Sequence, residues 1–256
     1  MNKILATTCL LCMILCSCHK DLDDEVFPTS VTFNFSHSWD DTPVTASDFN
    51  SLEFTNAHGE LLSISKLRYL ISRITFEKPN GEYFTFDDHF LVDLTQENTL
   101  SLTPNNTIPP GEYSHVYFTF GFNNEDNYMN YTDLNSASWN VPEMLGGGYH
   151  FMQLEGKFID ATNTETGYAY HYIRAVDNTQ SPLVFEDTFF TVDIGAVNLS
   201  QTTNFNINMN IAEWFKNPNT WDLNQLNNML MPNSDAQMMM YQNRQNVFSL
   251  ESVNPF

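Results

Sequence analysis

Imidazole side chains offer the clearest chemistry in this sequence. Seven histidines are present in 256 residues, and three of them stand beside aromatic or apolar residues in strand-like segments: His37, His150 and His171. Neutral imidazole is a ligand for copper and zinc and suits calcium poorly, so these histidines predict a transition-metal site if they converge. Taken one at a time, each of them also fits a packed, hydrogen-bonded histidine of a protein core.

Thioether and oxygen groups are weaker candidates for ligands. Methionine is frequent near the end of the chain, at Met229, Met231 and residues 238–240, and thioethers bind Cu(I). At helical spacing, however, methionine usually fills a core, and we interpret these residues in that way. The segment 123–127 is rich in oxygen ligands for calcium but lacks the spacing of an EF-hand, so we interpret it as a surface loop.

No enzyme motif accompanies these residues. The sequence contains no Gly-rich phosphate loop, nucleophile elbow or zincin helix. Neighbouring carboxylates such as Asp87 and Asp88 carry little information in a chain with 31 acidic and 10 basic residues. We therefore predict a binding protein rather than an enzyme. The net charge of −21 repels polyanions and argues against a nucleic-acid partner.

All four cysteines lie near the N-terminus, at Cys9, Cys12, Cys16 and Cys18. A basic residue followed by an apolar run describes a secretory signal, and Leu15-Cys16-Ser17-Cys18 resembles a bacterial lipobox. We predict a lipoprotein signal peptide over residues 1–17, lipidation of Cys18 and an acidic tether over residues 18–30; an ordinary signal peptide cut elsewhere is the alternative. The protein is then an outer-membrane lipoprotein, periplasmic or surface-exposed, which its N-terminal lipid holds on the membrane. Its folded body has no thiol and no disulfide.

The elements that must position the histidines are strands. Apolar and polar residues alternate from Val31 onward, and Asn80-Gly81 between two such runs predicts a hairpin. The predicted strands are 31–39, 69–76, 83–86, 90–94, 113–122, 149–159, 168–175, 189–194 and 205–211. Helix-like spacing follows at 212–215, 223–231 and 235–243. We predict an all-β protein: a single β-sandwich domain over residues 31–256 with short C-terminal helices.

Several segments together resemble the MbnP-like family. Residues 33–37, Phe-Asn-Phe-Ser-His, resemble its opening strand, and residues 54–60 resemble its Asn-Ala-x-Gly-Glu turn. Residues 65–74 are similar to its Ser-Lys-x-x-Tyr strand, and residues 147–156 to its Gly-Gly-Tyr-His-Phe-Met segment. His171 falls where the family has its next histidine. The resemblance covers roughly residues 31–250.

The resemblance implies an extracytoplasmic β-sandwich related to the copper-binding partner of methanobactin cassettes. It puts forward as metal ligands His37, His150 and His171. In some relatives an oxidised tryptophan, made with a di-haem peroxidase, is a further copper ligand, so the resemblance also implies such a peroxidase as a partner. Trp39 and Met144 are then additional neighbours of the site, and Trp139 is the other tryptophan that fits this role.

Strand alternation predicts the geometry of that site. His37 has apolar neighbours at even spacing, and so does His171, which lies between Ala169 and Ile173. We therefore expect His37 and His171 to meet inside one end of the sandwich, near enough to share one ion. His150 is expected one layer away.

The function that follows is that of a lipid-anchored, extracytoplasmic metal-binding protein, with copper as the metal. The alternative is a surface module that binds glycans or proteins without a metal, for which the 14% aromatic content and the acidic, Asn-rich surface would be suited. The third hypothesis is a purely structural member of the family that has lost the metal site.

Overall fold

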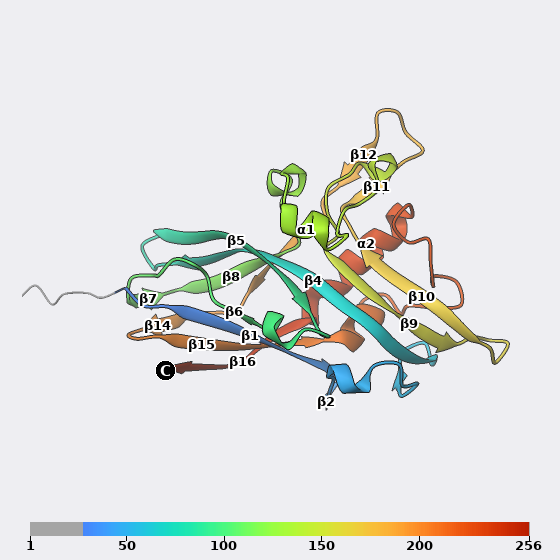
Figure 1. Cartoon of the computed structure of the whole chain (residues 1–256), viewed down its shortest axis with the longest axis horizontal. Helices are drawn as coiled ribbons and strands as arrows, with labels where there is room; N and C mark the ends of the chain where they lie inside the picture. Colours follow the sequence, from blue (N-terminus) through green and yellow to red (C-terminus); the bar gives the residue numbers. More distant parts are fainter. Residues whose placement is uncertain (1–27, 256) are drawn as a thin grey trace, which may run out of the picture.

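The computed structural model describes residues 28–255. The predicted signal peptide, Cys18 and all but the end of the tether lie outside this range. Two large sheets face each other with an apolar core between them (Figure 1), so the predicted all-β sandwich is confirmed. No helix within the described residues is long and apolar enough to cross a membrane.

The first sheet contains five strands: β1 (Val31–Trp39), β2 (Thr42–Pro43), β6 (Ser101–Leu102), β15 (Thr203–Asn210) and β16 (Phe248–Pro255). β1 and β15 are parallel neighbours, although almost the whole domain separates them in sequence. In β15 the buried residues Phe205, Ile207 and Met209 alternate with half-buried asparagines, as the sequence pattern predicts.

The second sheet contains seven strands: β3 (Phe54–Thr55), β4 (Leu61–Glu77), β5 (Tyr83–Asp93), β8 (His115–Phe120), β9 (Met152–Ile159), β10 (Glu165–Tyr172) and β13 (Phe190–Asp193). β4 is its spine, because it pairs with β5 along one edge and with β9 and then β8 along the other. The hairpin between β4 and β5 is the predicted one, and Gly81 takes a φ of 84° in its turn.

Aromatic rings connect the two sheets. Phe33 of β1 stacks on Phe205 of β15 with ring centroids 4.8 Å apart, and it meets Phe76 of β4 edge-on at 6.3 Å. Phe35 of β1 meets Phe118 of β8 edge-on at 5.9 Å. Such pairs add to the apolar area that the core buries, so the aromatic content of the chain is used mainly in its interior.

Shorter elements close the ends of the sandwich. Two small sheets pair β7 (Gly111–Tyr113) with β14 (Val197–Leu199) and β11 (Ala175–Asp177) with β12 (Val184–Glu186). The α-helices are α1 (Thr132–Ser136) and α2 (Ser234–Asn243). The 3₁₀ helices are η1 (Ala46–Asp48), η2 (Glu97–Thr99), η3 (Asp126–Tyr128), η4 (Glu143–Leu145), η5 (Ile211–Phe215) and η6 (Arg244–Asn246).

The C-terminal helices match the prediction in two of three places. Residues 212–215 lie in η5 and residues 235–243 in α2, whereas the helix predicted over 223–231 is wrong. This segment forms turns, because Asp222 accepts the backbone N–H of Asn224 at 2.9 Å and Trp221 Nε1 donates to the Leu226 carbonyl at 2.9 Å. These bonds compete with a helical ladder.

Gln237 ties α2 to the end of β10. Its side chain is fully buried, donates from Nε2 to the carbonyls of His171 at 2.9 Å and Leu230 at 3.0 Å, and accepts the N–H of Ile173 at 2.9 Å. The helix therefore fixes the backbone that carries His171.

Candidate metal centre

Two of the three predicted histidines lie together at one end of the second sheet. His150 precedes β9 and is separated only by Tyr149 from three glycines with positive φ (Gly146, Gly147 and Gly148), and His171 is in the neighbouring strand β10. Their ring centroids are 5.2 Å apart, with the rings nearly perpendicular at 85°. Two nitrogens that share an ion through bonds of about 2 Å lie at most about 4 Å apart, a separation that rings at this spacing can present.

His150 presents a free lone pair. Its Nδ1 lies 2.9 Å from the carbonyl oxygen of Trp139, which can only accept, so Nδ1 carries the hydrogen and Nε2 does not. Within residues 28–255, Nε2 is buried and has no hydrogen-bond partner. Burial lowers the pKa of His150 to about 4, so the ring is neutral at neutral pH. An oriented, neutral imidazole with an unused buried nitrogen is the form in which histidine binds metals.

His171 is oriented by a carboxylate. Its Nε2 lies 2.9 Å from Oε1 of Glu155, and Lys66 Nζ donates to the same oxygen at 2.7 Å. These two partners, with the His171 hydrogen bond as the larger effect, hold the pKa of Glu155 at about 2. The ionised carboxylate accepts the Nε2 hydrogen, and in the neutral ring Nδ1 then carries the lone pair. A carboxylate behind a histidine is the common outer partner of a metal-binding imidazole.

His171 also borders an apolar cavity of about 440 Å³. We call it the methionine cavity because its lining includes three methionines; the lining residues are Met144, Leu145, Ala169, His171, Asn178, Met229, Leu230, Met231 and Pro232. Met144 and Met229 are 77% and 75% exposed, so the interpretation of Met229 as core filler is wrong, whereas Met240 is buried as expected. Met144, which the family resemblance implies as a neighbour of the site, lines this cavity together with His171.

Trp139 completes the surroundings of His150. The two ring centroids are 5.6 Å apart, and the Arg68 guanidinium lies 5.0 Å from the indole centroid. The indole is fully buried, and its Nε1 has no hydrogen-bond partner within the described residues. Of the two tryptophans that the family resemblance brings forward, Trp139 is therefore the one that contacts a histidine of this centre.

His37 lies elsewhere, so its predicted meeting with His171 is wrong. His37 Nε2 is 3.1 Å from the hydroxyl of Tyr69, a fully buried residue of β4. Sheet register aligns Tyr69 with Met152 and Tyr172, whereas His171 aligns with Gln153, one residue further along, and thus points to the opposite face. His150, rather than His37, is therefore the histidine that lies beside His171.

The reason for this error lies in β10. Its buried residues are Tyr168, Tyr170 and Tyr172, and the residues between them, including Ala169 and His171, are half-buried. The three tyrosines bury far more area than Ala169, so they take the inner face and turn His171 outward. Trp39 also lies away from His150: its ring stacks on Phe54 at 5.1 Å, and its Nε1 donates to the carbonyl of Thr55 at 3.2 Å.

Glu155 has no distinguishing sequence signal. One carboxylate among 31 acidic residues is uninformative until a neighbouring strand is aligned with it. The polar residues Gln153, Glu155 and Lys157 of β9 do alternate with buried Met152 and Leu154, which places Glu155 on the outer face with His171.

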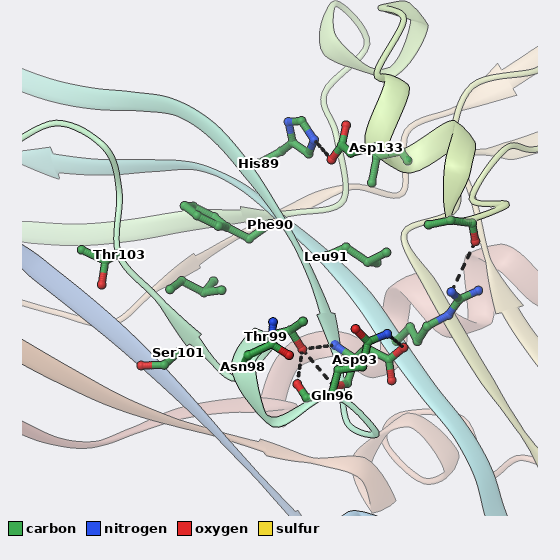
Figure 2. A pocket seen from close by; sticks show the side chains of 14 residues that line it. His89, Phe90, Leu91, Asp93, Gln96, Asn98, Thr99, Ser101, Thr103 and Asp133 are labelled. Atoms are coloured by element: carbon green, nitrogen blue, oxygen red, sulfur yellow. Dashed lines mark hydrogen bonds and ion pairs between the residues drawn. The ribbon is translucent and has the colours of Figure 1, made fainter.

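A second, larger cavity is lined by polar and apolar groups in similar measure. It measures about 580 Å³ and lies between β5, η2 and α1, with His89 and Asp133 at one end and Asp93 and Thr99 at the other (Figure 2). His89 Nε2 is 2.8 Å from Asp133, and Asp93 Oδ1 accepts hydrogen bonds from the backbone N–H and the hydroxyl of Thr95, just before η2. Its polar groups are thus largely paired with one another, and the cavity gives little support to a glycan site.

The buried His37 makes stability depend on pH. Burial lowers its pKa to about 4, against about 6.5 in the unfolded chain. Between these values the unfolded chain binds a proton that the folded protein does not, so the free energy of unfolding decreases as the pH falls from about 6.5 to about 4. Such a shift corresponds to about 3 kcal/mol. Urea unfolding of the metal-free protein should show this loss, and His37→Gln should remove about that part of it; an identical pH profile for the variant would contradict the assignment.

Fold and site together define a β-sandwich protein with a paired-imidazole candidate metal centre. Residues 28–237 match the sequence model of the family described as MbnP, so the chain belongs to the MbnP family, as its motifs suggest. A solved structure, MbnP from Methylosinus trichosporium, is similar at 10% identity over 74% of this chain and 78% of that chain, with a TM-score of 0.49. Comparison with curated proteins found no match.

Proposed function

We propose that this chain is an extracytoplasmic copper-binding protein that holds the ion between Nε2 of His150 and Nδ1 of His171. The observation that carries the proposal is the buried, unpartnered Nε2 of His150 beside a second oriented imidazole. Leaving such a nitrogen without a partner costs stability unless a ligand uses its lone pair. The role is one of binding rather than catalysis.

The nature of the donors supports copper. Two neutral imidazoles suit copper and zinc, and the thioethers of the methionine cavity beside His171 are soft ligands that favour Cu(I). Membership of the MbnP family agrees with this choice, since the sequence resemblance implies copper binding. We extend the proposal to a di-haem peroxidase as partner and to Trp139, rather than Trp39, as the tryptophan that it would act on.

The N-terminal segment supports an extracytoplasmic location. The lipobox-like Leu15–Cys18 sequence and the acidic tether suggest that Cys18 anchors the protein in the outer membrane, on the periplasmic side or at the surface. Replacement of Cys18 with alanine should release the protein from the membrane fraction; retention there would argue against the anchor.

Copper loading tests the proposal directly. The purified protein is incubated with Cu(I) under reducing, anaerobic conditions, desalted and assayed for metal. One copper per chain is expected, and none after exchange of both His150 and His171 for alanine. A protein that retains no copper, or a double variant that retains one equivalent, would overturn the assignment. A glycan array with the same protein distinguishes copper binding from the alternative function. Selective binding to particular glycans would favour a surface module that works without a metal.

The carboxylate behind His171 should tune the affinity. The Glu155 carboxylate orients the His171 ring and makes its nitrogen more basic, and Glu155→Gln removes both effects. Loss of an outer partner of this kind costs about 10- to 100-fold in metal affinity. Competition titration with a Cu(I) chelator measures the change. Glu165→Gln is the matched control, since Glu165 is an exposed residue at the far end of β10 and pairs with Lys157; equal affinities for both variants would exclude the proposed role.

A further inference from the structure

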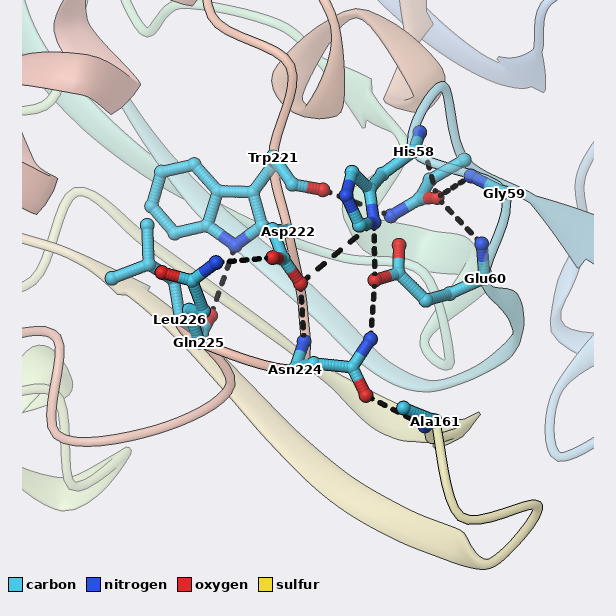
Figure 3. Close-up of polar contacts among 10 residues, drawn as sticks. His58, Gly59, Glu60, Ala161, Trp221, Asp222, Asn224, Gln225 and Leu226 are labelled. Atoms are coloured by element: carbon cyan, nitrogen blue, oxygen red, sulfur yellow. Dashed lines mark hydrogen bonds and ion pairs between the residues drawn. The ribbon is translucent and has the colours of Figure 1, made fainter.

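A second group of metal-binding side chains lies in the turn between β3 and β4. His58 Nδ1 is 2.7 Å from Oε1 of Glu60 and 3.7 Å from Oδ1 of Asp222, which follows η5. One ligand atom from each of the three side chains lies within 4.8 Å of the other two (Figure 3). The sequence pattern at His58-Gly59 indicates only a turn, so this convergence depends on the fold.

Asparagine side chains hold the three groups in place. Asn56 Oδ1 accepts the backbone N–H groups of His58, Gly59 and Glu60 at 3.1, 3.0 and 3.0 Å, and its Nδ2 donates to the Trp221 carbonyl at 3.2 Å. This buried side chain therefore shapes the turn and fastens it to the segment that carries Asp222.

Asn224 adds a second connection. It donates from Nδ2 to Glu60 Oε1 at 2.8 Å, and its Oδ1 accepts the N–H of Ala161 from the hairpin between β9 and β10 at 2.7 Å (Figure 3). The ligand geometry is thus fixed by three separate segments before any ion arrives, which lowers the entropic cost of binding.

Glu60 carries the independent sign of a missing ligand. The residue is 6% exposed, and within residues 28–255 its Oε2 is buried without a hydrogen-bond partner. A buried carboxylate oxygen without a partner is costly, and here a second carboxylate, that of Asp222, lies close by. Only the imidazole of His58 balances these two groups among the described ion pairs.

We propose that His58, Glu60 and Asp222 form a binding site for a divalent first-row cation, with Zn²⁺ as the best match. Imidazole nitrogen and carboxylate oxygen both bind zinc, and a set of three protein ligands leaves the fourth position open to water. The side chains of His58 and Asp222 are 43% and 21% exposed, so the site opens to solvent on that side. The donor set contains no sulfur, which disfavours Cu(I) and distinguishes this site from the His150–His171 centre.

Calorimetric titration with Zn²⁺ tests the site. The starting protein carries His150→Ala and His171→Ala, so that zinc cannot occupy the other centre. This protein should bind one Zn²⁺ per chain and melt at a higher temperature when zinc is present. Adding Asp222→Asn or His58→Gln should weaken binding by more than about tenfold, whereas Glu53→Gln, an exposed acid beside the turn, should not.

Two results would overturn the proposal: no zinc binding by the starting protein, or equal affinity in all variants. If Asp222→Asn does not fold, the more exposed His58→Gln decides. Copper retention by a His58→Gln chain with His150 and His171 intact is expected to match that of the wild type, so a failure of this site and a failure of the copper centre give different outcomes.

Discussion

Replacement of His150 with alanine is expected to lower the affinity for Cu(I) by more than about 100-fold. Loss of an outer partner alone costs about 10- to 100-fold, and His150 supplies a ligand atom itself. The fold should survive, because the backbone N–H of residue 150 donates to the Trp139 carbonyl at 3.0 Å and does not need the side chain. Competition with a Cu(I) chelator gives the affinity, and thermal unfolding confirms that the variant is folded.

His115→Ala serves as the control for this measurement. The His115 side chain is 51% exposed and lies 2.7 Å from Asp193 at the edge of the second sheet, so its loss should leave copper affinity unchanged. If the two variants bind copper equally well, the buried nitrogen of His150 is not a ligand and the copper site lies elsewhere.

Gly156→Ala should be the most damaging single substitution in the second sheet. A Cβ at this position in β9 would lie 1.9 Å from the carbonyl oxygen of Ser63 in β4, and backbone cannot move aside as a flexible side chain can. Overpacking usually costs about 1–3 kcal/mol, and a backbone clash between central strands belongs at or above the upper end. At about 2–4 °C per kcal/mol, the melting temperature should fall by roughly 10 °C.

Gly167→Ala gives the matched comparison. Gly167 lies in the adjacent strand β10, and the nearest atom to its added Cβ is the Gly156 carbonyl oxygen at 3.9 Å, an ordinary contact. Its melting temperature should change by no more than a few degrees. A similar loss for both variants would show that glycine flexibility, rather than the clash, governs this pair of strands.

Local patterns in the sequence predict the strands well because burial on one face has a period of two. The β1 and β15 segments have the predicted alternation, and the β4–β5 hairpin turns at Gly81 as expected. The pattern does not reveal the length of β4, which runs on from Leu61 because β9 pairs with its first half. Nor does it exclude a helix over 223–231, where side-chain bonds to the backbone favour turns.

The sequence singles out candidate histidines but not their arrangement in space. Family motifs put forward His37, His150 and His171 alike, and they do not show that only His150 and His171 lie together. The apolar neighbours of His171 suggest the wrong face, because the larger tyrosines of β10 take the inner one. His58 and Asp222 could not be paired from the sequence, since their contact depends on how η5 and the following turns lie against the β3–β4 turn. Long-range convergence of this kind leaves no local signal.

The parallel pairing of β1 with β15 also constrains how the molecule assembles. His37 and its partner Met209 are brought side by side only after nearly all of the intervening chain has been made, and closing so long a loop precedes any gain from the contact. The segments that carry His150 and His171, by contrast, are joined by the β9–β10 hairpin, so only a short loop has to close to bring them together. The β9–β10 hairpin can therefore form early in folding, while the sheet that shields the interior waits for the last strands.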